Sequence, residues 1–307
     1  MRNIFKLGLF VLFVFVLTNG LKIKQKKTVV NNKNSLFVFG DIGVYNNELK
    51  NMVNIAESRK DKNDKIILLG DNFYPDGVAS LSDKLWSNYS NTFKNIDKSK
   101  IHAVIGNHDY HQDPRPQINN FYWNTPNFYY KVSFDKNIDL FFIDTVQLYD
   151  GHCGIYKNKI EKIHGDSIDN LAYKQLNWLQ SELEKSNKHK IVFGHYPILS
   201  NGYYSSYMEP LYEILYPIFK RYNVKAYVSG HEHNIQYLKK KDREYVFNQF
   251  IVGCSSEYRD NEYKKFCFRD MFNDSDNYII NIKSTDNNNL LFDFINSKDN
   301  IDYSYTV

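Results

Sequence analysis

Five short segments of the chain combine a glycine with side chains of the types that bind metal ions. The segments are Gly40-Asp41-Ile42-Gly43, Gly70-Asp71-Asn72-Phe73-Tyr74, Gly106-Asn107-His108-Asp109, Gly194-His195-Tyr196-Pro197 and Gly230-His231-Glu232-His233. Together they offer carboxylate, phenolate, amide and imidazole groups, a mixture that suits two hard or borderline ions better than one tetrahedral zinc. The chemistry that these residues predict is therefore that of an enzyme with two metal ions.

Each segment taken alone has a simpler interpretation. A Gly-Asp-x-Gly segment is most often a turn, because both residue types are ordinary turn formers. Two histidines one residue apart, such as His231 and His233, also occur as polar loop residues or on alternate sides of an exposed strand. The recurrence of five such segments is what favours a metal site.

A near-continuous apolar run precedes each segment. The runs are Leu36–Phe39, Ile66–Leu69, Ala103–Ile105, Ile191–Phe193 and Ala226–Val228. Short runs rich in β-branched and aromatic residues predict strands that are buried on both faces of a sheet. The candidate ligands would then follow the carboxyl ends of strands, which is the edge where open α/β sheets bind ligands. A glycine before the ligand permits a tight turn close to the ion.

Four segments have apolar residues at the spacing of three to four that is typical of helices packed on a sheet. They are Asn47–Glu57, Leu81–Ile96, Leu171–Leu183 and Leu211–Arg221. The alternation of strand and helix signals favours a sheet sandwich with flanking helices. The segment between Asp150 and Ser167 lacks periodicity and is predicted to be a long loop near the active-site edge.

The order and content of the five segments resemble the calcineurin-like metallophosphoesterases, and Tyr74 after Asn72 resembles the purple acid phosphatases among them. The resemblance is to the small, tartrate-resistant type and covers about Leu36 to Leu238. It implies an α/β fold (α+β by some schemes) in which two packed mixed β-sheets are flanked by helices in a four-layer sandwich.

The same resemblance implies seven ligands for two metal ions. These would be Asp41, Tyr74 and His233 on a ferric ion, Asn107, His195 and His231 on a divalent ion, and Asp71 between the two ions. Phenolate and carboxylate are hard anionic ligands that favour Fe(III), whereas an amide and two imidazoles suit Fe(II), Zn(II) or Mn(II). The cofactor expected is thus Fe(III) with one divalent ion of iron, zinc or manganese.

The reaction implied is hydrolysis of a phosphomonoester by a metal-bound hydroxide, because two ions about 3.5–4 Å apart stabilise the entering and leaving oxygens. By resemblance, the catalytic residue His108 faces the substrate and protonates the leaving alkoxide. The alternative is a supporting histidine paired with a carboxylate such as Asp109. In the mammalian-like branch a second substrate-facing histidine follows Gly-His-Tyr-Pro, but Ile198–Tyr204 contains none.

Two alternatives from other classes remain open. One is a catalytically weak, phosphatase-like scaffold that anchors partners at a membrane, against which the complete ligand set argues. The other is a different metallophosphoesterase, such as a phosphodiesterase or nuclease, against which Tyr74 argues. The substrate could be a phosphoprotein, a nucleotide or a small phosphoester.

The N-terminus has the layout of a secretory signal peptide. Arg2 and Lys6 flank the start of the apolar run Leu7–Leu17, which is too short to favour a spanning helix. We expect a signal peptide over residues 1–20, a flexible lysine- and asparagine-rich segment over 21–35 and the phosphoesterase domain over 36–307. An uncleaved anchor held by the following lysines is the alternative. The mature protein would be secreted or lumenal and glycosylated, with acceptor sequons at Asn88 and Asn273.

Composition is consistent with one soluble domain. A chain of 307 residues that is 42% hydrophobic can bury a sizeable core, and its net charge of +4 gives no argument for a nucleic-acid partner. The basic cluster Lys239–Lys241 with Arg243 is interpreted as a solvated face. We expect a monomer that has no stable membrane span after signal cleavage.

The three cysteines cannot all pair with one another. Cys254 and Cys267 could close a local loop. By resemblance, Cys153 occupies the place of a half-cystine, but no cysteine stands where its partner would lie. Cys153 is therefore expected to be unpaired or paired differently.

Overall fold

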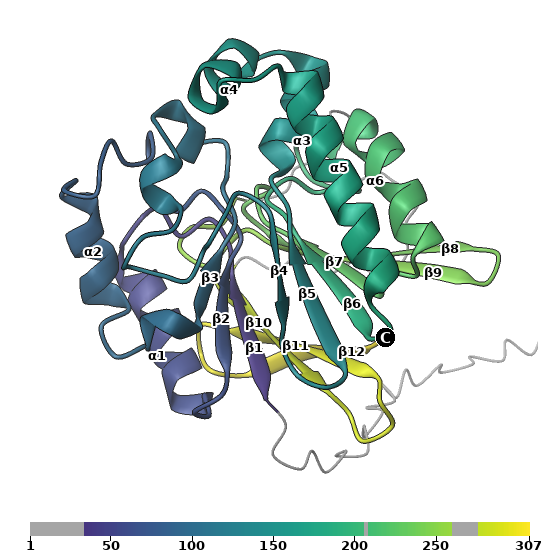
Figure 1. The fold of residues 1–307 in the computed structure, drawn as a ribbon. Coiled ribbons are helices and arrows are strands. Elements are labelled where there is room, and N and C mark those ends of the chain that lie inside the picture. Colours follow the sequence, from purple (N-terminus) through teal and green to yellow (C-terminus); the bar gives the residue numbers. More distant parts are fainter. Residues whose placement is uncertain (1–33, 206–207, 260–275) are drawn as a thin grey trace, which may run out of the picture.

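The computed structural model describes residues 34–205, 208–259 and 276–307, without the side chains of residues 150–153. Two six-stranded sheets face each other at the centre of the molecule (Figure 1). The first sheet has the order β12(Ile301–Thr306)-β11(Leu290–Asn296)-β10(Tyr278–Ser284)-β1(Ser35–Phe39)-β2(Lys65–Leu68)-β3(Ile101–Ala103). The second has the order β4(Tyr130–Ser133)-β5(Ile138–Phe142)-β6(His189–Phe193)-β7(Ala226–Ser229)-β9(Tyr245–Val252)-β8(Ile235–Asp242).

Both sheets are mixed, and the parallel strands end where the segments with the candidate metal ligands begin. Strands β1, β2 and β3 are parallel to one another, with Val38 opposite Ile67. Strands β5, β6, β7 and β9 are also parallel. Because parallel strands end at the same edge, the segments that follow β1, β2 and β3 emerge together, and so do those that follow β6 and β7.

Helices cover the outer face of each sheet (Figure 1). They are α1(Asn47–Arg59) and α2(Leu85–Thr92) on the first sheet, with α3(Thr145–Cys153), α4(Lys157–His164), α5(Ile168–Lys185) and α6(Glu209–Arg221) on the side of the second. Asn46 caps α1 by accepting a hydrogen bond from the Leu49 N–H at 2.9 Å, and Ser167 caps α5 in the same way.

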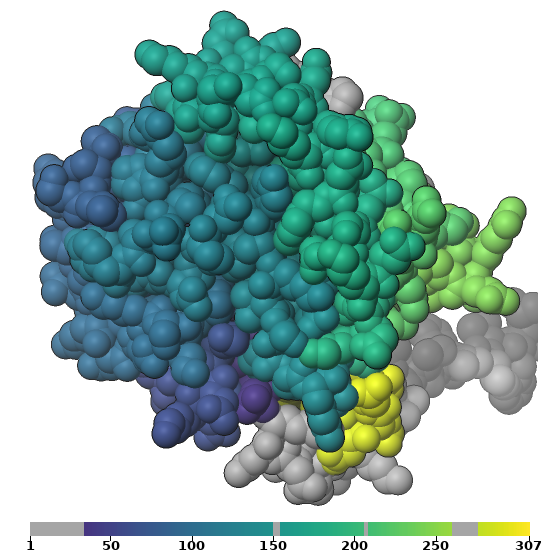
Figure 2. Space-filling model, viewed as in Figure 1, coloured from purple at the N-terminus to yellow at the C-terminus, as the bar shows by residue number. Residues whose placement is uncertain are grey.

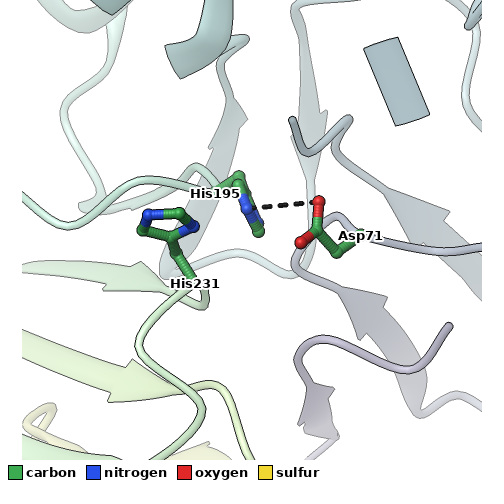
Figure 3. A group of neighbouring side chains, drawn as sticks. All are labelled: Asp71, His195 and His231. Atoms are coloured by element: carbon green, nitrogen blue, oxygen red, sulfur yellow. Dashed lines mark ion pairs between the residues drawn. The ribbon is translucent and has the colours of Figure 1, made fainter. Parts of the chain in front are cut away.

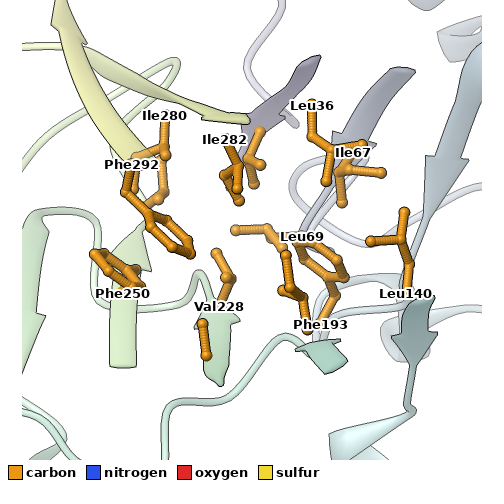
Figure 4. Packing of buried hydrophobic residues seen from close by; sticks show 14 of the residues in the cluster. Leu36, Ile67, Leu69, Leu140, Phe193, Val228, Phe250, Ile280, Ile282 and Phe292 are labelled. Atoms are coloured by element: carbon orange, nitrogen blue, oxygen red, sulfur yellow. The ribbon is translucent and has the colours of Figure 1, made fainter. Parts of the chain in front are cut away.

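Three apolar layers hold these four structural layers together. Leu36 and Val38 of β1 point toward the second sheet, where they join a cluster that includes Phe193, Val228 and Phe250 (Figure 4). Phe37 and Phe39 of the same strand point the other way, toward α1 and α2. This alternation explains why β1 is apolar throughout, since both of its faces are buried. The predicted α/β sandwich of two mixed sheets flanked by helices is confirmed.

The region between Asp150 and Ser167 differs from the prediction of a long loop. It contains the end of α3 and all of α4, and only short connections remain. Helix α4 is short, so two apolar residues, Ile160 and Ile163, are enough to pack it, and Gly165 ends it at a φ of 66°. Helix α2 is also shorter than the predicted Leu81–Ile96.

Several sequence predictions concern surface or terminal features. The β8–β9 hairpin (light green) extends to one side of the molecule in Figure 2, and the exposed Lys239, Lys241 and Arg243 lie on it. Asn88 is exposed on α2. Cys254 is a free, fully buried thiol. Among the described residues, no helix combines the length and apolar character needed to cross a membrane.

Four of the predicted features lie outside the described part of the chain. They are the signal peptide, nearly all of the segment over residues 21–35, the sequon at Asn273 and the side chains of Cys153 and Cys267.

Candidate metal centre

The seven predicted ligands converge at one edge of the sandwich, in loops contributed by both sheets. The first sheet provides Asp41 after β1, Asp71 and Tyr74 after β2, and Asn107 after β3, and the second provides His195 after β6 with His231 and His233 after β7. The three histidines and two aspartates are buried, with at most 8% of each residue exposed. The site is therefore assembled only when the two sheets pack against each other.

Asp71 lies between two groups of candidate ligands. One ligand atom each of Asp71, His195 and His231 lie within 4.8 Å of one another, and the same holds for Asp41, Asp71 and His233. The Asp71 Oδ1 atom is 3.4 Å from His195 Nε2 (Figure 3), while its Oδ2 atom is 3.1 Å from the Tyr74 hydroxyl. One carboxylate thus contacts both halves of the cluster, as a bridging ligand must.

Tyr74 belongs to the group formed by Asp41, Asp71 and His233. Its hydroxyl oxygen is 2.9 Å from His233 Nε2 and 3.4 Å from Asp41 Oδ1. Asn107 belongs to the other group, because its Oδ1 atom is 3.0 Å from His195 Nε2. Tyr74 and Asn107 thus lie in different halves of the cluster, while the ion that each residue would hold stays a prediction.

A backbone carbonyl orients His195, and this contact was not foreseen from the sequence. His195 Nδ1 is 2.8 Å from the Leu69 carbonyl oxygen, which can only accept a hydrogen bond, so Nδ1 carries the proton. The unprotonated Nε2 then faces Asn107 and Asp71. Outer contacts of this kind fix the tautomer and ring orientation of metal-binding histidines.

His108 borders the cluster without belonging to either group. Its ring is perpendicular to that of Tyr74 at a centroid distance of 4.6 Å, and its Nε2 is 4.0 Å from Asp71 Oδ2. Its side chain is 30% exposed, and Nδ1 is 2.5 Å from the Pro75 carbonyl oxygen. The ring is therefore partly exposed at the edge of the cluster.

Asp109 is not the partner of His108; the carboxylate nearest to its ring is that of Asp71, so a supporting role for His108 stays an alternative. Asp109 is fully buried and instead accepts hydrogen bonds from the Asn72 N–H at 3.1 Å, the Gly106 N–H at 2.9 Å and the Gln117 amide at 3.0 Å. It therefore joins the loop after β2 to the loop after β3. This network was missed because it depends on contacts between residues far apart in the sequence.

Four of the seven residues have a backbone conformation that is uncommon outside glycine. The φ angles are 54° for Asp41, 49° for Asp71, 71° for His231 and 48° for His233. Such angles cost free energy and concentrate at functional sites. One hydrogen bond helps to offset this cost: the His231 N–H donates to Asp41 Oδ2 at 2.8 Å. This bond also joins a loop of one sheet to a loop of the other.

One of the glycines that precede a ligand, Gly106, has a role other than the predicted turn. Gly106 does not have a positive φ, but a Cβ atom there would overlap the backbone nitrogen and carboxylate of Asp71. Of the five glycines that precede a ligand, Gly70 alone has a positive φ, at 87°. Close approach of neighbouring loops, more than turn geometry, explains the glycine at position 106.

We expect Gly106→Ala to lower metal content because its methyl group displaces Asp71 from the centre. Overpacking in a rigid site costs about 1–3 kcal/mol, and a shift of Asp71 also weakens metal binding. Metal analysis by mass spectrometry after dialysis against a weak chelator measures the effect. Gly165→Ala is the control, because a Cβ atom there meets nothing within 4 Å and the strain that its φ of 66° imposes falls at the end of α4, not on a candidate ligand. Equal metal loss in both variants would contradict the explanation.

Burial makes this cluster unfavourable for isolated charges. Burial, followed by the neighbouring Asp71, raises the pKa of Asp41 and of Tyr74 well above their usual ranges. Burial also lowers the pKa of His195, that of His231 strongly, and that of His233 to about 4. The imidazoles are thus held in the neutral form that coordinates metal ions.

The donor set is suited to two cations. Within the described part of the chain, histidines are the only ion-pair partners of Asp41 and Asp71. Arg259 acts on Asp41 from beyond ion-pair distance, so the two buried carboxylates carry a desolvation cost that bound cations would offset. The residues present therefore fit a centre of two metal ions.

Comparison with known proteins agrees with the geometry. The family model described as calcineurin-like phosphoesterase matches residues 35–234, which include all five segments. The chain therefore belongs to the calcineurin-like phosphoesterase family.

Two relatives resemble this chain in sequence. Tartrate-resistant acid phosphatase type 5 of Mus musculus is 32% identical over 195 residues, which cover 58% of each chain. Purple acid phosphatase 3 of Arabidopsis thaliana is 34% identical over 198 residues, which cover 60% of this chain and 52% of the plant protein. The chain thus matches little more than half the length of these relatives.

A solved structure extends the similarity of the fold. GAP50, described as the anchor in the inner membrane complex of Plasmodium, superposes with a TM-score of 0.68 at 22% identity, covering 90% of this chain and 89% of that protein. At this identity the likeness concerns the fold alone.

Proposed function

We propose that the protein is an acid phosphatase that hydrolyses phosphomonoesters at a centre of Fe(III) and a divalent iron, zinc or manganese ion. The observation that carries this proposal is the convergence of the Tyr74 hydroxyl with Asp41, Asp71 and His233. A phenolate in a carboxylate-rich group favours a hard trivalent ion. The sequence relatives named acid phosphatases support the same reaction.

Each residue would have a defined task. Asp41, Tyr74 and His233 would hold the ferric ion, Asn107, His195 and His231 the divalent ion, and Asp71 would contact both. When bound, the two ions would activate water as the nucleophile and neutralise the charge that develops on the phosphoryl group.

His108 would act on the leaving group. Its exposed ring at the edge of the cluster can donate a proton to the oxygen of the departing alcohol. The contact with the Pro75 carbonyl holds Nδ1–H, so Nε2, which faces Asp71, is the nitrogen turned toward the centre. Nε2 can donate a proton from the doubly protonated imidazolium form of the ring. No side chain needs to form a covalent bond with the phosphoryl group.

We further propose that residues 36–307 form one phosphoesterase domain and that the N-terminal segment directs the protein into the secretory pathway. The strand order supports one domain, because the first strand, β1, pairs with β10 in the same sheet that contains the last strands, β11 and β12. The two ends of this region therefore belong to one sheet. Expression of the full chain in cells, followed by detection of the protein in the medium and in the cell lysate, tests whether the N-terminal segment directs secretion. Retention of the protein in the cytosol would contradict it.

The visible absorption spectrum tests the proposed centre. A phenolate bound to Fe(III) gives a charge-transfer band in the visible region, so the iron-loaded protein is expected to be coloured and Tyr74→Phe to be colourless. Tyr130→Phe is the matched control, because Tyr130 is a buried tyrosine whose hydroxyl donates to the Ala103 carbonyl. Metal analysis and turnover of p-nitrophenyl phosphate accompany the spectrum.

Two other results of the spectrum and metal analysis would favour the alternative functions. A colourless, active protein that holds only zinc or manganese would be another type of metallophosphoesterase. A correctly folded protein that binds no metal would support the scaffold or anchoring role.

A further inference from the structure

A pocket of about 380 Å³ lies beside the candidate metal centre, on the side of Asn107 and His231. Five tyrosines, at positions 149, 156, 196, 203 and 204, line much of the rest of it. Its volume is at the small end of the range for sites that bind small molecules. Among the described residues that line it, none is a lysine, arginine, aspartate or glutamate.

Aromatic rings form a continuous wall that starts at the candidate ligand His231. The Tyr204 ring lies 4.1 Å from the His231 ring, centroid to centroid, with an angle of 31° between their planes. Tyr196 contacts the same imidazole edge-on at 4.6 Å, and Tyr149 contacts Tyr196 at 5.2 Å. Tyr203 extends the wall outward from Tyr204 at 4.9 Å and is 58% exposed.

Three buried polar side chains fix the loop that carries Tyr203 and Tyr204. Gln249 Oε1 accepts the Ile198 N–H at 3.2 Å and the Leu199 N–H at 3.0 Å, and Gln236 Oε1 accepts the Asn201 N–H at 2.9 Å.

Glu232, which stands between the candidate ligands His231 and His233, completes this anchoring. Its Oε1 atom accepts the Tyr204 N–H at 3.1 Å and a hydrogen bond from the Ser200 hydroxyl. Gly202 passes so close to this carboxylate that a Cβ atom would overlap it. The loop is therefore held in place before any ligand binds, which lowers the entropic cost of binding there.

We propose that this pocket binds the aromatic group of the substrate alcohol and makes the protein selective for phosphomonoesters of small, uncharged aromatic alcohols. This inference rests on the proposed phosphatase function. A phosphate held at the centre would be close to Asn107 and His231, so the alcohol attached to it can extend into the adjoining pocket. Arg259 hydrogen-bonds the Tyr204 side chain but is not among the described residues that line the pocket. Aromatic walls of this kind favour a planar apolar group over a sugar or a second phosphate.

The reaction itself is ordinary hydrolysis. Oxygen from water bonds to phosphorus, the phosphorus–oxygen bond to the alcohol breaks, and the alcohol leaves with a proton. The pocket adds binding energy for the aromatic alcohol and takes no part in the bond changes.

Three substrates with leaving groups of similar basicity separate the pocket from the chemistry. We expect kcat/KM for 2-phenylethyl phosphate to exceed that for ethyl phosphate about tenfold or more, because the ring is buried. It should exceed that for 2-cyclohexylethyl phosphate about two- to tenfold, because aromatic contacts add to burial.

Variants of the wall should reduce this preference. Tyr203→Ala and Tyr204→Leu are each expected to lower the ratio of 2-phenylethyl to ethyl phosphate turnover at least about threefold. Tyr173→Ala is the matched control, because Tyr173 is a 66% exposed tyrosine on α5 outside the pocket. The ratio should not change in that variant.

A binding measurement tests the pocket without turnover. Calorimetry on the metal-loaded protein should show tighter binding of 2-phenylethylphosphonate than of ethylphosphonate, with the difference reduced in Tyr203→Ala. Hydrolysis of ethyl phosphate with no aromatic preference would overturn the inference and leave the proposed function intact. Tighter aromatic binding without hydrolysis of any ester would overturn the function and leave the pocket. Equal binding of the two phosphonates would overturn the pocket.

Discussion

Asp71→Asn is expected to reduce phosphomonoester turnover on the order of 10³-fold or more and to lower the metal content of the protein. Asp71 contacts both halves of the cluster, through His195 on one side and Tyr74 on the other. An asparagine keeps the size of the side chain but removes the negative charge and one acceptor oxygen. A neutral amide cannot bridge two cations as a carboxylate does.

The control for this variant is a buried aspartate away from the centre. Asp293 on β11 is 4% exposed and pairs with Lys283 at 2.8 Å. Asp293→Asn should lower the free energy of unfolding without changing the metal content. Mass spectrometry for metals and kcat for p-nitrophenyl phosphate are measured on both variants, and full activity of Asp71→Asn would disprove the bridging role.

Asp109→Ala is expected to lower the free energy of unfolding by about 3–5 kcal/mol. The substitution leaves the N–H groups of Asn72 and Gly106 and the Gln117 amide without their buried acceptor. It also frees the loops after β2 and β3 from each other, so Asp71 and Asn107 lose their fixed relative position. Metal affinity should fall about 10- to 100-fold, as for other groups that orient ligands.

Urea unfolding followed by circular dichroism, with and without metal, measures this effect. Asp109→Asn is the matched variant, since it keeps the volume and one acceptor oxygen and should lose less stability than alanine. If the two variants are equally stable, the hydrogen bonds of Asp109 do not hold these loops.

The convergence of the candidate ligands could be predicted from the sequence because each motif follows a buried strand. Once the apolar runs before Asp41, Asp71 and His195 are interpreted as parallel strands, their carboxyl ends must meet at one edge. The two sets of ligands are implied by the resemblance and stay a prediction; in the structure Tyr74 lies beside His233 and Asn107 beside His195.

Other features could not be predicted from one sequence. Helix α4 has only eight residues, and its two apolar contacts give too weak a periodicity to detect. The Asp109 network and the contact of His195 with the Leu69 carbonyl depend on loops that meet only after the strands have paired. The positive φ angles of four candidate ligands also arise from tertiary contacts, because neither aspartate nor histidine demands them locally.

The apolar layer between the two sheets has a consequence for metal selection. Leu69, Phe193 and Val228 lie in this layer, two or three residues before Asp71, His195 and His231 (Figure 4). The bulk of these side chains acts as a spacer that sets how far the ligands of one sheet stand from those of the other. If two ions bind, the distance between them would depend on apolar side chains that contact neither ion, so adding or removing one methylene group in this layer would change metal binding without altering any candidate ligand.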